Sequence, residues 1–166
     1  MTVDSSISIE NARLVFRNFS GKEGKYNPEG RRNFCVLLEE DIAKSLKKDG
    51  WNIRWLEPKD PEDEKQAYIQ IAVAFGRISP RIILISGGIR STLEEGTVNV
   101  LDWAEIETAD LIIRPYNWEV GPNKGVKAYL KTAYITIKED EFAHKYRDVP
   151  DAGATLQSDE DPPWTV

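Results

Sequence analysis

Apolar and polar residues alternate over short stretches along most of the chain, a pattern that predicts half-buried β-strands. Polar segments containing glycine or proline separate these stretches. The expected strands are residues 7–19, 33–38, 51–56, 68–75, 81–85, 111–118 and 126–138. We expect the last two to form a long hairpin that is closed by a turn at residues 121–124.

Helical patterns are short. Residues 39–48 place Ile42, Ala43 and Leu46 on one side and end in lysines before Gly50, which predicts a helix with a glycine C-cap. Two further short helices are expected at residues 101–108, with Trp103 in the core, and at 139–146. Many short strands with one or two short helices predict a mainly β protein, an OB-fold-like antiparallel barrel that is closed or partly closed.

Charge is distributed unevenly along the 166 residues. The chain carries 22 basic and 28 acidic residues, a net charge of −6. Five of the acids, and no Lys or Arg, lie in residues 148–166, so residues 1–147 are close to neutral. We therefore expect one folded domain at 1–147 and a disordered acidic tail at 148–166. A neutral domain can still carry one basic face.

The tail ends in an aromatic anchor. Asp159, Glu160 and Asp161 precede two prolines and Trp164. Acids beside one large apolar side chain suit docking into a basic-rimmed pocket of a partner protein. The alternative is a Trp that folds back onto the domain.

The single cysteine, Cys35, lies in the apolar run 34–38, where a buried and unreactive thiol is expected. The apolar runs are too short for a membrane span, and residues 1–6 lack the basic and apolar regions of a signal peptide. These features predict a cytoplasmic protein with no membrane association.

One face of the last hairpin is the strongest candidate site. Strand alternation puts three residues of each strand on that face: Arg114, Tyr116 and Trp118 on the first, and Lys127, Tyr129 and Lys131 on the second. The expected turn places Tyr116 opposite Tyr129 and Arg114 opposite Lys131. Rings interleaved with cations, with no acid among them, suit the stacking of unpaired bases and contact with phosphates. The alternative is ordinary packing of rings under Lys and Arg stems.

The polar loop at residues 21–32 offers a second basic wall. Its candidates are Lys25, Tyr26, Arg31 and Arg32, and its glycines permit close approach of a strand. A solvated charged loop is the alternative. Arg13 and Arg17 on the first strand would extend the basic face or would simply point to solvent.

Motifs for catalysis are weak. Residues 47–50 match the K-x-D-G of nucleotide ligases, but lysines and a glycine are expected at a helix end in any case. Residues 63–65 imitate a nuclease D-x-K without convergent metal ligands. We expect no enzymatic activity, no metal and no cofactor.

A second function class stays open: a β-barrel protein-interaction module, or an inhibitor that mimics DNA, with no strand binding of its own. The acidic net charge favours it, but the acids concentrate in the tail.

Several segments resemble the single-stranded DNA-binding proteins of tailed bacteriophages, which are OB-fold proteins. The resemblance is carried by residues 17–21, 27–34, 49–53, 101–103, 114–118 and 125–130, and together they span roughly residues 7–147. It implies sequence-tolerant binding of single-stranded DNA, rather than RNA, in phage replication and recombination. It also implies that the tail recruits replication or recombination proteins. The tail departs from that of bacterial single-stranded DNA-binding proteins, which end in a terminal Phe, because Thr165 and Val166 follow Trp164. The sequence leaves the oligomeric state open.

Overall fold

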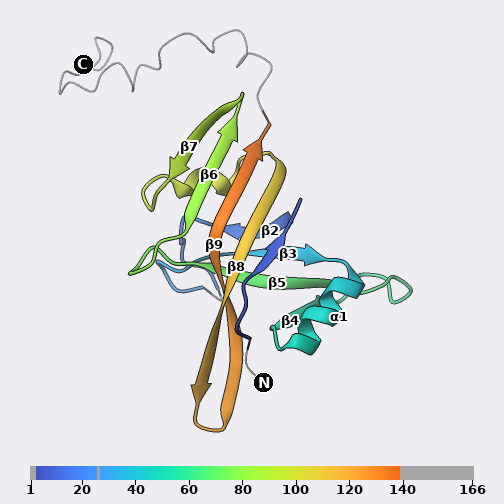
Figure 1. Ribbon diagram of the computed structural model, residues 1–166. Coiled ribbons are helices and arrows are strands. Elements are labelled where there is room, and N and C mark those ends of the chain that lie inside the picture. Colours follow the sequence, from blue (N-terminus) through green and yellow to red (C-terminus); the bar gives the residue numbers. More distant parts are fainter. Residues whose placement is uncertain (1–2, 26, 139–166) are drawn as a thin grey trace, which may run out of the picture.

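The computed structural model describes residues 3–25 and 27–138, and within them the protein is mainly β (Figure 1). The strands are β1 Ile7–Ile9, β2 Arg13–Asn18, β3 Arg32–Leu38, β4 Ile53–Leu56, β5 Gln66–Val73, β6 Arg81–Ser86, β7 Ile89–Leu93, β8 Ile106–Val120 and β9 Asn123–Ile137. The helix α1, Glu40–Asp49, joins β3 to β4, and a short 3-10 helix, η1, Val98–Asp102, precedes β8. The predicted helix at 139–146 and the tail at 148–166 lie outside the described residues.

The strands form one nine-stranded sheet of OB-like character. Its order is β1-β8-β9-β5-β3-β2, with β4 beside β5, β6 beside β9, and β7 beside β6. The sheet does not close, because β1 and β2 at the two ends of this order do not pair with each other. Two pairings, β5 with β9 and β6 with β9, are parallel. The expected mainly β, OB-like fold is therefore confirmed, but as an open sheet with both kinds of pairing.

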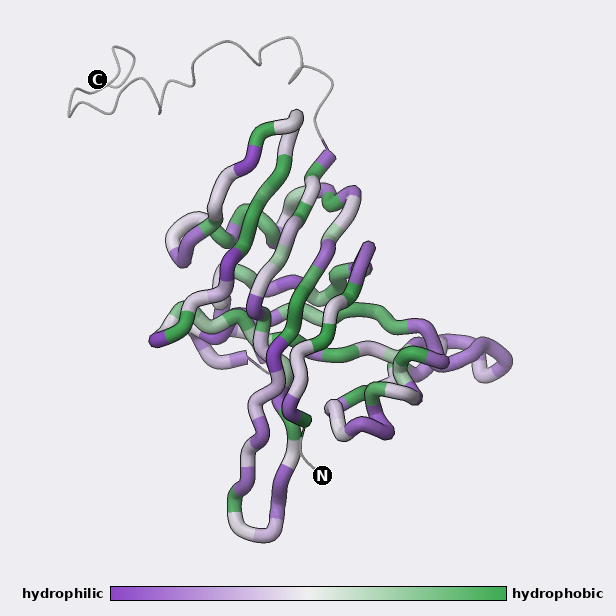
Figure 2. The backbone as a smooth tube through the Cα atoms, viewed as in Figure 1, coloured by the Kyte–Doolittle hydropathy of each residue, from purple (hydrophilic) through white to green (hydrophobic). Residues whose placement is uncertain are grey.

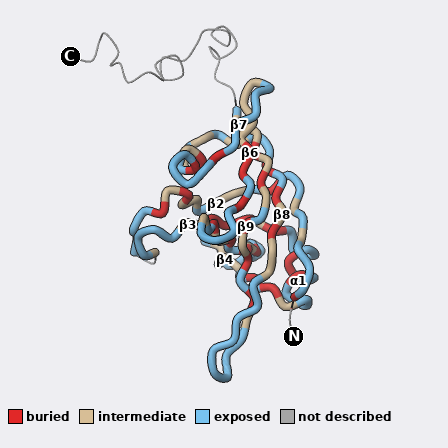
Figure 3. Tube along the Cα trace, turned by 60° about the vertical axis from the view of Figure 1, so that its left-hand side comes forward, coloured by how far each residue is buried: buried red, intermediate tan, exposed pale blue. Residues whose placement is uncertain are grey.

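The core follows from strand alternation. Along β5, Ala67, Ile69, Ile71 and Val73 are buried, whereas the residues between them face outward. Phe19 and Phe34 stack in the core with ring centroids 5.0 Å apart. Apolar segments gather where β2, β3 and β5 run across the β8–β9 hairpin (Figure 2), and the same region contains most of the buried positions (Figure 3). This packing fixes the strands whose outer faces carry the site.

The predicted strand at 7–19 is two strands. Asn11 adopts a left-handed φ of 49°, and its N–H donates to the Asp110 carboxylate at 2.8 Å. A bulge between Val15 and Asn18 further distorts β2, and Phe16 within it has a φ of 50°. Contacts with a distant part of the chain set this break, so local alternation did not predict it.

The predicted helix at 101–108 is wrong: η1 ends at Asp102 and β8 begins at Ile106. Long-range hydrogen bonds hold this segment. The Asp102 carboxylate accepts the N–H groups of Phe19 and Ser20, and Arg17 donates to the carbonyls of Leu101 and Ala104 at 2.9 and 2.7 Å. Arg17 thus connects β2 to η1 and the segment after it by hydrogen bonds, and it is not part of an open basic face.

Trp103, which was expected in the core, is 64% exposed. Trp51 is buried, and Trp55 packs partly against the core.

The K-x-D-G match is the end of α1. Gly50 has a φ of 112° and donates its N–H to the Lys47 carbonyl at 3.1 Å, a glycine C-cap. The Lys47 ammonium lies 4.8 Å from the centre of the Trp55 ring. Of the predicted inner stripe, Ala43 is buried and Ile42 is exposed.

Cys35 is buried as expected, and burial raises the pKa of its thiol to about 11. A thiol with this pKa is protonated and unreactive at neutral pH.

No helix within residues 3–25 and 27–138 combines the length and the apolar character that crossing a membrane requires.

Candidate nucleic-acid interface

The outer half of the β8–β9 hairpin projects from the body as a two-stranded arm, which we define as residues 114–129 (Figures 1 and 3). Val120 pairs with Asn123, so only Gly121 and Pro122 form the turn. Gly121 has a φ of 59°, and the proline ring fixes the next φ near about −65°, the sign order of a type II′ turn. The predicted four-residue turn at 121–124 is wrong.

The tighter turn shifts the register of the arm. The observed pairs are Arg114–Tyr129, Tyr116–Lys127 and Trp118–Gly125. The predicted pairs, Tyr116 with Tyr129 and Arg114 with Lys131, are therefore wrong by two residues. Because side chains alternate with a period of two, a shift of two leaves each one on the same face. The predicted face of rings and cations is thus present with different partners.

Lys131 leaves this regular pattern. Ile112 pairs with Thr132 and Ile113 pairs with Leu130, so Lys131 is the extra residue of a bulge. Its side chain is exposed where the arm leaves the body.

Tyr129 is the centre of a cation–π cluster. The Arg114 guanidinium carbon lies 4.7 Å from the Tyr129 ring centroid, and the Lys127 ammonium lies 5.2 Å from it. Tyr116 meets the same ring edge to face, with centroids 5.9 Å apart at 85°. These contacts hold two positive charges at fixed places on the arm. They also cover Tyr129, which is half-buried, whereas Tyr116 is 52% exposed.

Trp118 lies across the arm on Gly125. A Cβ atom at residue 125 would come within 2.8 Å of the Trp118 indole, so only glycine lets the ring lie this close to the backbone. Trp118 is 38% exposed and lines the groove described next. Gly125 therefore sets the orientation of the ring that the arm presents.

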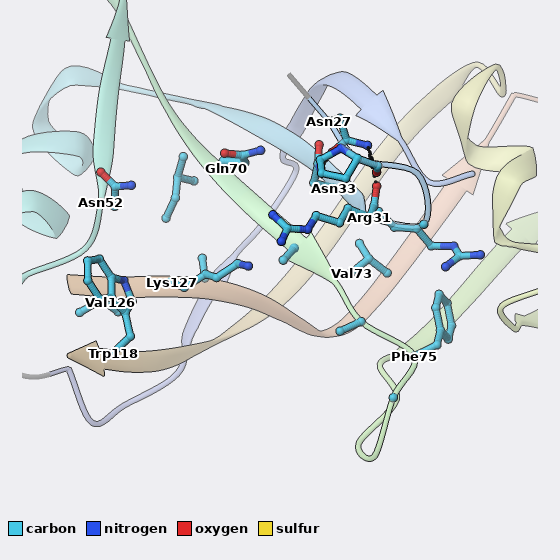
Figure 4. A pocket seen from close by; sticks show the side chains of 18 of the residues that line it. Asn27, Arg31, Asn33, Asn52, Gln70, Val73, Phe75, Trp118, Val126 and Lys127 are labelled. Carbon is cyan, nitrogen blue, oxygen red and sulfur yellow. Dashed lines mark hydrogen bonds between the residues drawn. The ribbon is translucent and has the colours of Figure 1, made fainter. Parts of the chain in front are cut away.

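A groove of about 730 Å³ separates the arm from the loop at 21–31, and β5 forms its floor (Figure 4). Trp118 and Lys127 come from the arm, and Asn27 and Arg31 come from the loop. The sheet and its connections contribute Asn33, Asn52, Gln70, Ala72 and Phe75. The charged lining residues are Arg31, Arg32, Lys127 and one acid, Glu95. The groove thus brings Trp118 and Lys127 of one predicted wall together with Arg31 and Arg32 of the other, whereas Arg114, Tyr116, Tyr129 and Lys131 do not line it.

Asn27 of the loop and Asn33 of β3 hold the described part of the loop in place. The Asn27 amide donates to the carbonyls of Lys22 and Arg31, both at 3.0 Å, and accepts from the Asn33 amide at 2.8 Å. Gly30 donates its N–H to the Gly21 carbonyl at 2.8 Å. A Cβ at Gly21, where φ is 72°, would lie 3.2 Å from the Gly30 backbone. The loop therefore holds Arg31 at the groove as part of a fixed structure.

Arg32 belongs to the wall of the groove. Its guanidinium lies 3.4 Å from the Glu95 carboxylate and 5.6 Å from the centre of the Phe75 ring. The Arg32 Nε is buried without a hydrogen-bond partner. Lys25 is exposed and does not line the groove, and Tyr26 lies outside the described residues.

Sequence reasoning missed the amides of the groove. Asn33, Asn52 and Gln70 are polar residues at outward positions on or beside apolar strands, a pattern that ordinary solvated faces share. Their only distinguishing signal is that all are amides and none is charged. Within the part of the chain that the structure describes, no three His, Cys, Asp or Glu side chains come together as a metal site.

An OB-like sheet that presents rings, amides and cations along one groove defines the class of nucleic-acid-binding OB domains. The family model of the phage ssDNA-binding domain matches residues 2–165. The chain belongs to this family, and it is a phage single-stranded DNA-binding protein.

Solved structures of the single-stranded DNA-binding protein from bacteriophage Enc34 share the fold. The complex with ssDNA matches with a TM-score of 0.56 at 16% identity, over 82% of this chain and 89% of that chain. The protein alone matches with a TM-score of 0.54 at 16% identity, over 90% of this chain and 89% of that chain. At this identity the likeness concerns the fold alone. No curated protein sequence matches the chain.

Proposed function

We propose that the protein coats single-stranded DNA in a sequence-tolerant manner and protects it during phage replication and recombination, without catalysis. One observation carries the proposal: Trp118 and Lys127 of the arm, Arg31 of the loop and the amides of Asn33 and Gln70 line a single groove. The cation–π cluster around Tyr129 lies on the same arm. Membership of the phage ssDNA-binding family supports it, as does the shared fold with the Enc34 protein, which was solved in complex with ssDNA.

In this mechanism bases stack on Tyr116 and Trp118, whose rings are partly exposed. Each stacked base contributes about 1–3 kcal/mol, and stacking accepts any base because every base has a flat face. Tyr129 joins the stack once Arg114 or Lys127 turns from its ring to a phosphate.

The phosphates are held by cations on both sides of the groove. The proposed set is Arg114, Lys127 and Lys131 from the arm side, with Lys25, Arg31 and Arg32 from the loop side. Tyr26 is proposed as a further stacking ring beside them. Arg32 contributes least, because Glu95 already compensates its charge.

The tail has a separate role in the proposal. Its acids compete weakly with DNA for the groove, and when DNA displaces it, residues Asp159, Glu160, Asp161 and Trp164 bind replication or recombination proteins. The five acids of residues 148–166 and the absence of Lys and Arg there support this role.

Tryptophan fluorescence during titration with oligo-dT tests the proposal. We expect quenching that weakens with added salt, because cations on the protein replace counterions along the strand. Trp118→Phe should remove most of the quenching, since among the tryptophans that the structure describes only Trp118 lines the groove. Duplex DNA and RNA serve as competitors. No quenching at either of two salt concentrations, with a protein partner recovered instead, would favour the interaction module.

A further inference from the structure

We infer that the path of the DNA continues beyond the groove, across the outer face of the sheet, to a second stacking platform formed by Phe16 and Tyr68 and flanked by Arg13 and Arg54. This inference rests on the proposed function of the groove. It adds a stretch of binding surface on β2 and β4, where the sequence pointed only to Arg13 and Arg17 as an extension of the basic face.

The platform is one row of side chains across four strands. The register pairs Arg13 with Leu37, Leu37 with Tyr68, and Tyr68 with Arg54. Directly paired residues on neighbouring strands lie on the same face of a sheet. A half-buried tyrosine ring therefore lies between two arginines that mark the ends of the row.

The same face leads directly into the groove. On β5, Tyr68, Gln70 and Ala72 alternate with buried residues and so share the outer side. Gln70 and Ala72 line the groove, and Ala72 pairs with Tyr129 of the arm. Tyr68 is only two residues from Gln70, about 7 Å along the strand. A strand that leaves the groove over Gln70 meets Tyr68 next.

Phe16 is held in an unusual conformation beside this ring. Its φ of 50° lies in the left-handed region, which a bulky residue rarely occupies, and it lies within the bulge of β2. The ring is 63% exposed and contacts Tyr68 edge to face at 6.5 Å. A bulge re-aims a side chain. Phe16 therefore combines a strained backbone with a large ring exposed to water. This combination favours a role of Phe16 in binding over a role in packing.

The charge of these strands suits a phosphate backbone. β2, β3, β4 and β5 contain Arg13, Arg17, Arg32 and Arg54 and no Asp or Glu, although acids outnumber bases in the chain. Arg17 and Arg32 are engaged by the body. Arg13 and Arg54 are exposed, and neither forms an ion pair within the described residues.

Arg54 also acts across the outer face. Its charge lowers the pKa of the Cys35 thiol, against the larger effect of burial, and Cys35 pairs with Gln70 on that face. Arg54, which the register places directly opposite Tyr68, therefore lies beside the path. Single-stranded DNA is the occupant that these observations favour, because the patch is continuous with the groove and carries only positive charge.

The test compares two lengths of oligo-dT on the full chain. A strand of about five nucleotides fills the groove, and one of about twelve reaches the platform, both within the range of OB-fold site sizes. Phe16→Gly removes the ring and suits the left-handed backbone, so the fold is retained. We expect it to weaken binding of the longer strand about 5- to 150-fold and to leave binding of the shorter strand unchanged.

Two variants serve as controls. Phe16→Tyr keeps a ring at the platform, and Ile78→Ala removes another exposed apolar side chain, from the β5–β6 connection. Both should bind the two lengths like the wild type. Arg13→Ala and Arg54→Ala should each lower the salt dependence for the longer strand, by roughly 0.7 in the log–log slope.

Unchanged binding of the longer strand by Phe16→Gly would overturn the inference. Equal weakening for both lengths would also overturn it, because Phe16 would then act on the groove or the fold. If Phe16→Gly without DNA sediments as a smaller species than the wild type, the platform binds a second copy of the chain instead of DNA. Failure of the wild type to bind either strand would instead refute the proposed function.

Discussion

The two halves of the β8–β9 hairpin use the same two strands in opposite ways. In the inner half, Leu111, Ile113, Ala133 and Ile135 are fully buried. In the arm, every residue from Tyr116 to Lys124 is exposed (Figure 3). The inner half makes the core, and the arm carries rings and cations that no core requires. A continuous hairpin thus lets a rigid, buried half position an exposed half.

One residue links the arm back to the body on its other side. The Asn117 side chain accepts the Val3 N–H at 2.9 Å and donates to the Val3 carbonyl at 2.7 Å. Val3 is buried, and its place opposite Asn117 continues the register in which Ile7 pairs with Ile113. Pro115 has no N–H for such a ladder. The amide thus replaces a missing backbone pair and braces the arm from the face opposite Tyr116 and Trp118.

The largest expected effect is a loss of stability when the inner half of the hairpin is changed. Ile113→Ala should lower the free energy of unfolding by about 2–5 kcal/mol, because it leaves a cavity in the core. Urea denaturation measures this loss. At the arm, Tyr116→Ala should change the unfolding midpoint little, and a comparable loss there would mean that the arm is part of the core.

Next in size is the binding loss at the arm. Trp118→Ala should weaken oligo-dT binding by about 1–3 kcal/mol, the contribution of one stacked base. Fluorescence anisotropy of a labelled oligonucleotide gives the affinity. Trp103→Ala is the matched control, since Trp103 is also exposed but does not line the groove. Equal losses from both substitutions would contradict the assignment of the groove.

Loss of the hydrogen bonds between Asn117 and Val3 should have an intermediate effect on DNA binding. Asn117→Ala removes two hydrogen bonds to Val3, each worth about 0.5–1.5 kcal/mol. We expect faster amide exchange in the arm and weaker oligo-dT binding, although Asn117 points away from the groove. Glu119→Ala, two residues along the same face of β8, should leave amide exchange unchanged and should not weaken binding, since it removes only a negative charge. Normal exchange in Asn117→Ala would show that the arm needs no brace.

A smaller change should come from Gly125→Ala. The added methyl displaces the Trp118 ring, so DNA affinity should fall by about 1 kcal/mol or less while the free energy of unfolding changes little. The control is Gly96→Ala, where a Cβ meets nothing within 4 Å. Tighter binding by Gly125→Ala would mean that the ring normally blocks the groove.

The smallest effect is expected from the tail. Deleting residues 148–166 removes five negative charges and should tighten oligo-dT binding modestly at low salt, with the gain lost as salt screens the repulsion. Affinities at two salt concentrations measure it. A looser complex after the deletion would refute competition by the tail.

Sequence alternation predicted which side chains share a face of the arm better than it predicted the turn and the strand boundaries. The face with Tyr116 and Lys127 was correct despite the wrong turn, because an error of two residues preserves a pattern of period two. Trp103 was misplaced because its surroundings depend on Arg17, more than eighty residues away in sequence. Gln70 was missed because an outward polar residue on a strand looks the same whether it faces a groove or solvent.

Binding of DNA along the arm can be tested by photo-crosslinking with an oligonucleotide that carries 5-iododeoxyuridine, because mass spectrometry then identifies the residues that touch DNA. We expect adducts on Tyr116 and Trp118, and none on the exposed Trp103. Adducts on Trp103, with none on the arm, would show that DNA binds elsewhere.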